Sequence, residues 1–248
     1  MESINNILNF EAISNASLFE DPFRWALLEN SFTSEVIADA LSQSFPSDFY
    51  GQKRRRLGES SSYGGHLLVG RGLVARQTGD VFQPASLDPR WLQLVDELMS
   101  DRYRKAMETL TGIDLADTQR ELICFRQPVG AYLDPHPDNR HKPVSQVFYF
   151  SQSDWDKDDG GCLRILRSRD QNDIFAEIEP RINRSVILVR SDHSWHGYPP
   201  VKTSSKGPRL CLQLFFCRPE MKFATEYGPD WTKAPVLTRN LWANAEED

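Results

Sequence analysis

The chain has few cysteines, and their arrangement excludes a disulfide-built protein. Its 248 residues include four cysteines, and no two of them form a CxxC pair. Cys211 and Cys217 fall six positions apart on one expected strand, a separation of about 20 Å that no disulfide can bridge. We therefore expect reduced, buried thiols and a cytoplasmic protein.

The chain also lacks long apolar runs and an excess of positive charge. No apolar run approaches the roughly 18 residues that a membrane span needs, and Met1–Ser14 lacks the basic and apolar regions of a signal peptide. The net charge is -6 and the pI is about 5.5. An acidic chain has no general electrostatic reason to bind nucleic acid or an anionic membrane, so we expect neither partner.

Hydrophobic residues make up 40% of the chain, enough for one sizeable core. Within an expected single domain, 1–248, residues 1–118 are predicted to be mostly helical. A helix is predicted to start at Asp21-Pro22 and run through Leu28, a Gly/Ser-rich loop to occupy 51–80, and one long helix to run from Asp88 to about Leu110.

The pattern changes at residues 119–218, where short apolar segments alternate with turn residues. The predicted strands are Glu121–Val129, Val144–Phe150, Cys162–Leu166, Ile174–Ile178, Ser185–Val189 and Leu210–Phe216. Several short strands after a helical block predict a mainly β or α+β fold, an antiparallel sandwich backed by N-terminal helices. Residues 219–248 form an irregular tail that includes Trp231, and this tail either packs on the core or folds over the pocket as a lid.

Candidate metal ligands lie in the segment Tyr132-Leu-Asp-Pro-His136-Pro-Asp138. On an extended segment, side chains two positions apart point to the same face, so His136 and Asp138 present an imidazole and a carboxylate together. One more histidine would complete the two-histidine, one-carboxylate triad of non-haem Fe(II) oxygenases. Only His193 and His196 lie far enough downstream to come from another strand.

A buried arginine is expected on the last strand, thirteen residues after His196. Arg209, Cys211, Gln213 and Phe215 share one face of that strand. An unpaired buried guanidinium is very costly, so Arg209 needs an anionic partner. A dicarboxylic co-substrate would supply that partner through a bidentate pair.

From about Leu122 to Phe216, the chain resembles the prolyl-4-hydroxylase-like branch of the Fe(II)/2-oxoglutarate dioxygenases. The matching elements, in chain order, are Gly130, Asp134-Pro-His136-Pro-Asp138, Val144-Ser-Gln-Val-Phe-Tyr-Phe150, Asp154-Trp-Asp156, Gly160-Gly-Cys-Leu-Arg-Ile-Leu166, His196-x-x-x-Pro-Val201 and Arg209.

The resemblance implies a double-stranded β-helix, the jelly-roll fold of the cupins, with Fe(II) as the metal. The family pattern favours His196 over His193 as the third ligand, beside His136 and Asp138. The resemblance also implies 2-oxoglutarate and O2 as co-substrates, with ascorbate as a supporting reductant. It assigns the terminal carboxylate of 2-oxoglutarate to Arg209, assisted by Tyr149 or, if no gap is allowed, by Phe150.

Departures from the family pattern bear on the substrate. Leu133 and Arg126 stand where relatives often carry tyrosines, and the segment Asn139–Pro143 is too short to form the finger loop of protein-directed members. This favours a small substrate. Because halogenating relatives lack the carboxylate that Asp138 supplies, we expect hydroxylation or another oxidation that begins with hydrogen abstraction. Candidate substrate contacts are Arg126, Asn139, Gln213 and Trp231.

The sequence leaves three functions in view. We expect an oxygenase that hydroxylates a C–H bond of a small amino-acid-like metabolite with release of succinate and CO2. The alternatives are a hydroxylase of a prolyl or other residue in a protein and a catalytically inactive β-helix that serves as a binding module. The occupied triad and Arg209 disfavour the inactive module, because degenerate members usually lose one of these residues.

Overall fold

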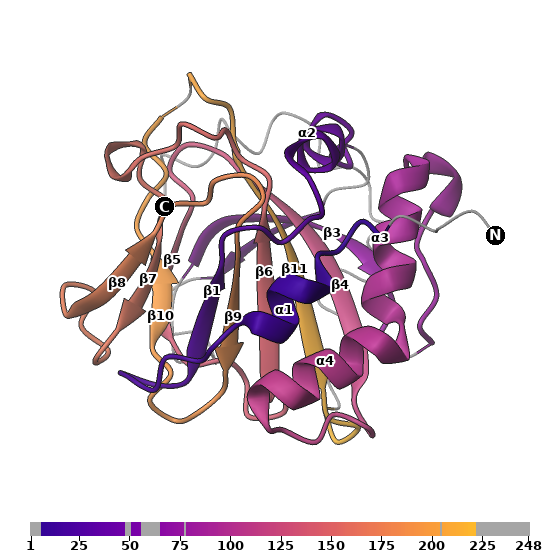
Figure 1. Cartoon of the computed structure of the whole chain (residues 1–248). Coiled ribbons are helices and arrows are strands. Elements are labelled where there is room, and N and C mark those ends of the chain that lie inside the picture. Colours follow the sequence, from indigo (N-terminus) through magenta and orange to yellow (C-terminus); the bar gives the residue numbers. More distant parts are fainter. Residues whose placement is uncertain (1–5, 48–50, 56–64, 77, 204, 222–248) are drawn as a thin grey trace.

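The computed structural model describes residues 6–47, 51–55, 65–76, 78–203 and 205–221, with only the backbone described at 51–55 and 65–68. Strands dominate, and helices from the first half of the chain pack against them (Figure 1). The helices are α1 (Phe10–Asn15), α2 (Glu35–Gln43), α3 (Pro89–Met99) and α4 (Asp101–Thr111). The strands are β1 (Trp25–Leu28), β2 (Gly51–Arg55), β3 (Gly65–Val74), β4 (Gln119–Gln127), β5 (Tyr132–His136), β6 (Val144–Tyr149), β7 (Leu163–Leu166), β8 (Ile174–Ile178), β9 (Ser185–Val189), β10 (His196–Tyr198) and β11 (Arg209–Cys217).

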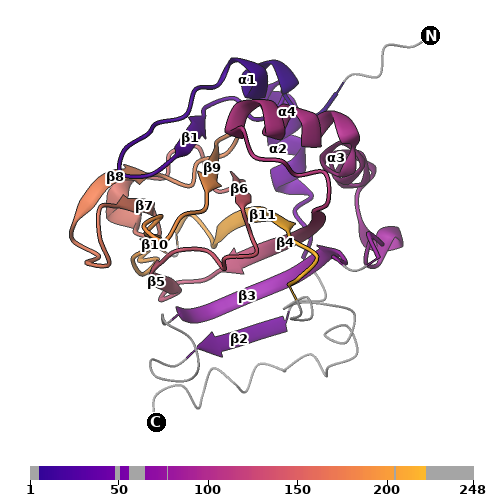
Figure 2. The same cartoon turned by 90° about the horizontal axis from the view of Figure 1, so that it is seen from below.

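The strands form one sheet that curls into a jelly roll. Their order is β1-β9-β6-β11-β4-β3-β5-β10-β7-β8, with β2 paired to β3, and the strand pairings are antiparallel. Strand β3 makes the corner, because Gly70–Val74 pairs with β4 while Gly65 and His66 pair with β5. Figure 2 shows the curl from below, with β5, β10, β7 and β8 turning away from the broad part of the sheet.

Two apolar cores follow from the alternation of side chains along these strands. Even-numbered residues of β6, such as Phe148, pack with the helices, whereas odd-numbered residues, such as Val147, point into the curl. All six residues of β6 are buried as a result. The outer core joins α1 to α4 with the sheet, and both views show these helices on one face of it (Figures 1 and 2). The inner core lines the space between the two halves of the roll.

The strand predictions for residues 119–218 are confirmed. Each of the six predicted strands matches an observed one, and β8 and β9 have the predicted bounds. The four cysteines are buried and unpaired, as expected. In the described part of the chain, no helix combines the length and the apolar character that a membrane crossing requires.

Three predictions for the first half of the chain are wrong. Trp25–Leu28 is not helical but forms β1, which pairs with β9 at the edge of the sheet. The supposed loop at 51–80 contains β2 and β3. The long helix is two helices, because Ser100 has extended backbone, ends α3 and caps α4 through its hydroxyl, which accepts a hydrogen bond from the Tyr103 N–H.

A buried polar chain joins the helical layer to the sheet. The Tyr103 hydroxyl on α4 donates to Gln146 Oε1 on β6, and Gln146 Nε2 donates to Ser185 Oγ on β9 at 2.8 Å. Ser31 Oγ also donates to Ser185 Oγ, at 2.7 Å. These partners are buried, so the loss of one leaves another without its hydrogen bond.

Tyr103→Phe should lower the free energy of unfolding by about 1–3 kcal/mol, because it leaves Gln146 Oε1 buried without a donor. The matched control is Tyr149→Phe, which removes a buried hydroxyl that has no hydrogen-bond partner among the described residues and should cost far less. Urea denaturation of both variants measures the difference. Equal losses in the two variants would contradict this role for the polar chain.

Candidate active site

Three possible metal ligands converge where two strands of the smaller half of the roll pair. His136 ends β5 and His196 begins β10, and they are direct cross-strand partners. Their ring centroids lie 4.6 Å apart. Asp138 follows two residues after His136, and ligand atoms of the three side chains lie within 4.8 Å of one another. Such a cluster can hold a divalent metal ion.

Backbone carbonyls fix the orientation of both imidazole rings. His136 Nδ1 lies 2.9 Å from the carbonyl oxygen of Asp134, and His196 Nδ1 lies 2.9 Å from that of Ser194. Because a carbonyl oxygen only accepts, each Nδ1 carries the proton in the neutral ring. The Nε2 lone pairs are therefore the ones available to a metal, which is the usual arrangement of metal-binding histidines.

The carboxylate of Asp138 is held in its charged form. Ser145 Oγ on β6 donates to Asp138 Oδ2 at 2.7 Å. Burial alone would raise the pKa of Asp138, but the nearby charges of His196, Lys142 and His136 and the hydrogen bond from Ser145 outweigh it and lower that pKa. The charged form is the one that binds a metal ion.

A fully buried arginine lies at the other end of the same cavity. Arg209 is 1% exposed and has no carboxylate partner among the described residues. Its Nε donates to the Gly161 carbonyl at 2.7 Å, and its Nη1 donates to Gln127 Oε1 and Cys211 Sγ. A guanidinium has five N–H donors, so the two on Nη2 remain for an acceptor that the described chain does not supply.

The Tyr149 hydroxyl is a second buried polar group beside this arginine. It has no hydrogen-bond partner in the described structure, and the guanidinium carbon of Arg209 lies 5.2 Å from the centre of its ring. Tyr149 belongs to the inner core, whereas Phe150 belongs to the outer one. Alternation along β6 thus places Tyr149, rather than Phe150, on the cavity side. Spare donors on Arg209 and Tyr149 fit the carboxylate of a bound ligand.

The cavity between these two ends is lined by β4, β6, β9 and β11 from one half of the roll and by β5, β7 and β10 from the other. Gln213, a candidate substrate contact, lines it, and so do the residues across from it on β4 and β6. The wall includes Ile123, Phe125, Val147, Leu163, Leu188 and Phe215, which are apolar, and Glu121, Gln127, Lys142 and Tyr198, which are polar. An apolar cavity with a few polar groups is typical of a small-molecule site.

The other predicted site residues lie elsewhere. Arg126 does not line the cavity, because alternation along β4 turns it to the opposite face and places Gln127 inside. Asn139 is exposed and accepts hydrogen bonds from the backbone of the turn that follows it. His193 is exposed and is not part of the ligand cluster. Trp231 and the proposed lid lie outside the described residues.

Sequence reasoning missed Gln127 and Tyr198, which hold Arg209 in place. Gln127 Nε2 donates to the Tyr198 hydroxyl at 2.6 Å, and the guanidinium carbon of Arg209 lies 4.5 Å from the Tyr198 ring centre. Gln127 is the direct cross-strand partner of Arg209. The register of β4 against β11 would have shown that Gln127 lies beside Arg209, but the sequence alone does not give that register.

Comparison with known proteins agrees with this site. Residues 122–217 match the family model described as the 2OG-Fe(II) oxygenase superfamily. The fold is shared with many solved structures, including these two. One is a prolyl-4-hydroxylase from Pseudomonas putida, with 18% identity, 84% of this chain and 96% of that chain covered, and a TM-score of 0.54. The other is an oxidoreductase of the 2OG-Fe(II) oxygenase family from Burkholderia pseudomallei, with 13% identity, coverages of 78% and 85%, and a TM-score of 0.53.

A search of curated proteins found no match. At such low identities, the structural likeness concerns the fold, and the family model covers the segment that carries the candidate ligands. The family model over residues 122–217 and the shared jelly-roll fold together indicate a 2OG-Fe(II) oxygenase. Enzymes of this family use Fe(II) and 2-oxoglutarate.

Ser145→Ala should weaken binding of a divalent metal by about 10-fold, because the hydroxyl that orients Asp138 is lost. Ser145→Thr keeps a hydroxyl at that position and should restore most of the affinity. Titration with Mn(II), followed by electron paramagnetic resonance, measures the dissociation constants. Equal affinities for the alanine variant and the unaltered protein would show that Ser145 does not support the metal ligand.

Proposed function

We propose that this enzyme hydroxylates a C–H bond of a small, amino-acid-like metabolite, with conversion of 2-oxoglutarate to succinate and CO2. His136, Asp138 and His196 would hold Fe(II), and Arg209 with Tyr149 would hold the terminal carboxylate of 2-oxoglutarate. The observation that carries the proposal is the pairing, in one cavity, of a three-ligand cluster with a buried arginine that has no acidic partner among the described residues. Bound together, Fe(II), 2-oxoglutarate and O2 would supply the oxidising chemistry.

The residues of the chain would bind and orient the co-substrate and shield it from water. Arg209 Nη2 and the Tyr149 hydroxyl offer donors to one carboxylate, which fixes one end of the co-substrate and turns its other end toward the histidines. The apolar side chains Leu163, Val147 and Ile123 line the space between. Exclusion of water from that space limits side reactions and strengthens the electrostatic contacts inside it.

The charges on the cavity wall support an amino-acid-like substrate. Glu121, Phe215 and Ser145 are neighbours in one row across β4, β11 and β6, and Ser145 bonds the candidate ligand Asp138. Lys142 Nζ lies 3.6 Å from the centre of the Phe215 ring. Glu121 and Lys142 thus line the cavity near Phe215 and the candidate metal ligands, and a ligand that carries both charges would suit this pair of groups.

The connection after Asp138 supports a small substrate. Lys142 N donates to the Asn139 carbonyl at 2.8 Å, and His141 N donates to Asn139 Oδ1 at 2.9 Å. The segment thus closes on itself as a tight turn and does not extend as an arm that could grip a polypeptide. For the compartment, we infer a reducing one such as the cytoplasm, supported by the four free, buried cysteines.

The substrate class can be tested by succinate release with a panel of free amino acids and their derivatives, beside prolyl peptides of matched concentration. We expect turnover with free metabolites and none above the uncoupled background with peptides. Turnover with peptides alone would replace the proposal with hydroxylation of a protein residue. Binding of Fe(II) and 2-oxoglutarate without turnover across the whole panel would favour an inactive binding module.

With the best substrate of that panel, Glu121→Gln should lower kcat/KM by about 10- to 100-fold, because the proposed charged hydrogen bond between Glu121 and the substrate becomes a neutral one. The KM for 2-oxoglutarate should stay within about 2-fold of the unaltered value, because Arg209 lies at the opposite end of the cavity. The control is Glu220→Gln, at an exposed position outside the cavity. An unchanged kcat/KM in Glu121→Gln would remove this residue from substrate recognition.

A further inference from the structure

Two glycines precede β7 and lie directly against the buried arginine. Gly160 and Gly161 have φ angles of +71° and +67°, a backbone conformation that favours glycine. The Gly161 carbonyl accepts the hydrogen bond from Arg209 Nε. A Cβ at Gly161 would lie 2.9 Å from Val201 Cγ2 and 3.1 Å from Arg209 Cδ. The glycine therefore contacts both the guanidinium and the aliphatic part of the arginine.

A buried tryptophan supports this glycine pair from the other side. Trp155 Nε1 donates to the Gly160 carbonyl at 2.9 Å, and the Trp155 ring packs with Ala131 and Val201. Gly160 also forms a β-bridge with Val201. A Cβ at Gly160 would lie 2.1 Å from the Pro200 carbonyl oxygen, so no larger residue fits there without a backbone shift. The glycine pair is thus packed between Arg209 on one side and Trp155 and Val201 on the other.

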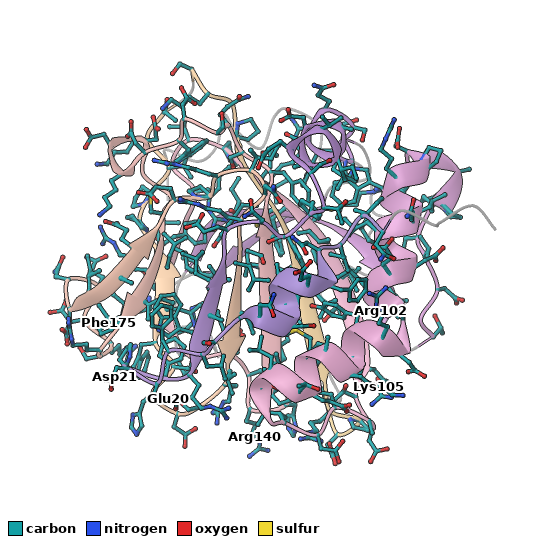
Figure 3. The ribbon with its side chains drawn as sticks, in the orientation of Figure 1. Glu20, Asp21, Arg102, Lys105, Arg140 and Phe175 are labelled. Carbon is teal, nitrogen blue, oxygen red and sulfur yellow. The ribbon has the colours of Figure 1, made fainter. Side chains whose placement is uncertain are left out.

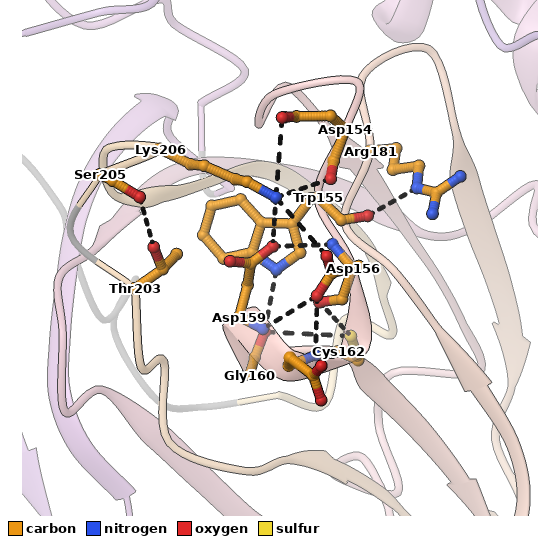
Figure 4. Close-up of polar contacts among 11 residues, drawn as sticks. Asp154, Trp155, Asp156, Asp159, Gly160, Cys162, Arg181, Thr203, Ser205 and Lys206 are labelled. Carbon is orange, nitrogen blue, oxygen red and sulfur yellow. Dashed lines mark hydrogen bonds and ion pairs between the residues drawn. The ribbon is translucent and has the colours of Figure 1, made fainter.

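An ion-pair cluster fastens the same turn to the segment that leads into β11 (Figure 4). Lys206 Nζ lies 2.7 Å from the Asp154 carbonyl oxygen and 2.8 Å from Asp159 Oδ2. Asp156 caps the short helical turn Lys157–Asp159 through the N–H groups of Asp158 and Asp159. The acidic side chains thus surround the ammonium of Lys206 and the backbone of their own turn, which accounts for the acidic run without a second metal.

We propose that Gly161 is a positioning residue for Arg209, and that the turn formed by residues 154–161 is the clamp that holds it. The inference rests on the proposed function, in which Arg209 binds the terminal carboxylate of 2-oxoglutarate. With Nε held by Gly161 and Nη1 by Gln127, the guanidinium plane is fixed, and the N–H groups of Nη2 remain for a ligand in the cavity that Arg209 lines. Without the clamp, rotation about the last bonds of the side chain would spread those donors over several directions.

The test compares two ligands on the Mn(II)-loaded protein. Both 2-oxoglutarate and 2-oxobutyrate carry the 2-oxo acid group, but 2-oxobutyrate has a methyl group in place of the terminal carboxylate and its neighbouring carbon. Water-proton relaxation of the bound Mn(II) reports the dissociation constant of each ligand. If Arg209 is misplaced, the binding of 2-oxoglutarate alone should weaken. A general loss of structure should instead weaken the binding of both ligands and of Mn(II) itself.

Gly161→Ala should raise the dissociation constant for 2-oxoglutarate by about 10-fold or more and leave that for 2-oxobutyrate within about 2-fold. Its matched control is Gly112→Ala, which has the same φ of +67° but only Arg24 Nη2 near the new Cβ, at 3.9 Å. Gly112→Ala carries the same backbone strain and should bind both ligands like the unaltered protein. Arg209→Ala should abolish the preference for 2-oxoglutarate.

Lys206→Met provides a second variant that leaves the buried glycines intact, in case Gly161→Ala does not fold. It should raise the dissociation constant for 2-oxoglutarate by about 3-fold and leave that for 2-oxobutyrate unchanged, because the Lys206–Asp159 ion pair is only partly buried and holds the clamp from its outer side. Lys105→Met, at an exposed position on α4, is its control (Figure 3).

The outcomes separate the two claims. If Arg209→Ala no longer binds 2-oxoglutarate while Gly161→Ala and Lys206→Met bind it like the unaltered protein, the proposed clamp is contradicted and the proposed function stands. If Arg209→Ala binds 2-oxoglutarate like the unaltered protein, the co-substrate site itself is wrong. Selective loss in Gly161→Ala, or in Lys206→Met should Gly161→Ala fail to fold, supports the clamp.

Discussion

A buried guanidinium, for which the described part of the chain offers no acidic partner, is the constraint on which the site depends. Taking a charge out of water is strongly unfavourable unless hydrogen bonds and a counter-charge replace the lost solvent. Here the chain supplies a backbone carbonyl, an amide oxygen, a thiol and two aromatic rings around Arg209, but among the described residues it supplies no carboxylate. The missing negative charge is what a dicarboxylic co-substrate would bring, so in the proposed function this ligand would stabilise the arginine and the arginine would select the ligand.

The candidate site itself could largely be predicted from sequence. An imidazole and a carboxylate two positions apart on an extended segment must share a face, and that local geometry survives in the fold for His136 and Asp138. Alternation along β11 likewise places Arg209 and Gln213 inside. Gln127 and Tyr198 could not be found this way, because their roles depend on the register between strands far apart in the chain. Arg126 lies one position away from the cavity-facing residue, because alternation along β4 places Gln127 inside.

The fold could be predicted where apolar strands alternate with turn residues. It could not be predicted where pairing with a distant strand decides whether a segment is a strand, a helix or a loop. Residues 119–218 carry clear alternation and turn signals, whereas Trp25–Leu28 is extended because it pairs with β9, and its local pattern also suits a helix. Strand β3 contains glycines that suggest a loop, yet it makes the corner of the roll through pairing with β4 and β5. The break at Ser100 separates two helices whose apolar faces would continue as one, so only the capping hydroxyl distinguishes them.

The central claim is that the triad and Arg209 together bind one Fe(II)–2-oxoglutarate chelate. Anaerobic titration of the metal-free protein with Fe(II) and 2-oxoglutarate tests it most directly, through the weak visible charge-transfer band of that chelate. The band should form in the unaltered protein and in His193→Ala, disappear in His196→Ala and weaken in Arg209→Ala. A folded, iron-loaded protein that gives no band, or a band lost in His193→Ala and kept in His196→Ala, would contradict the site.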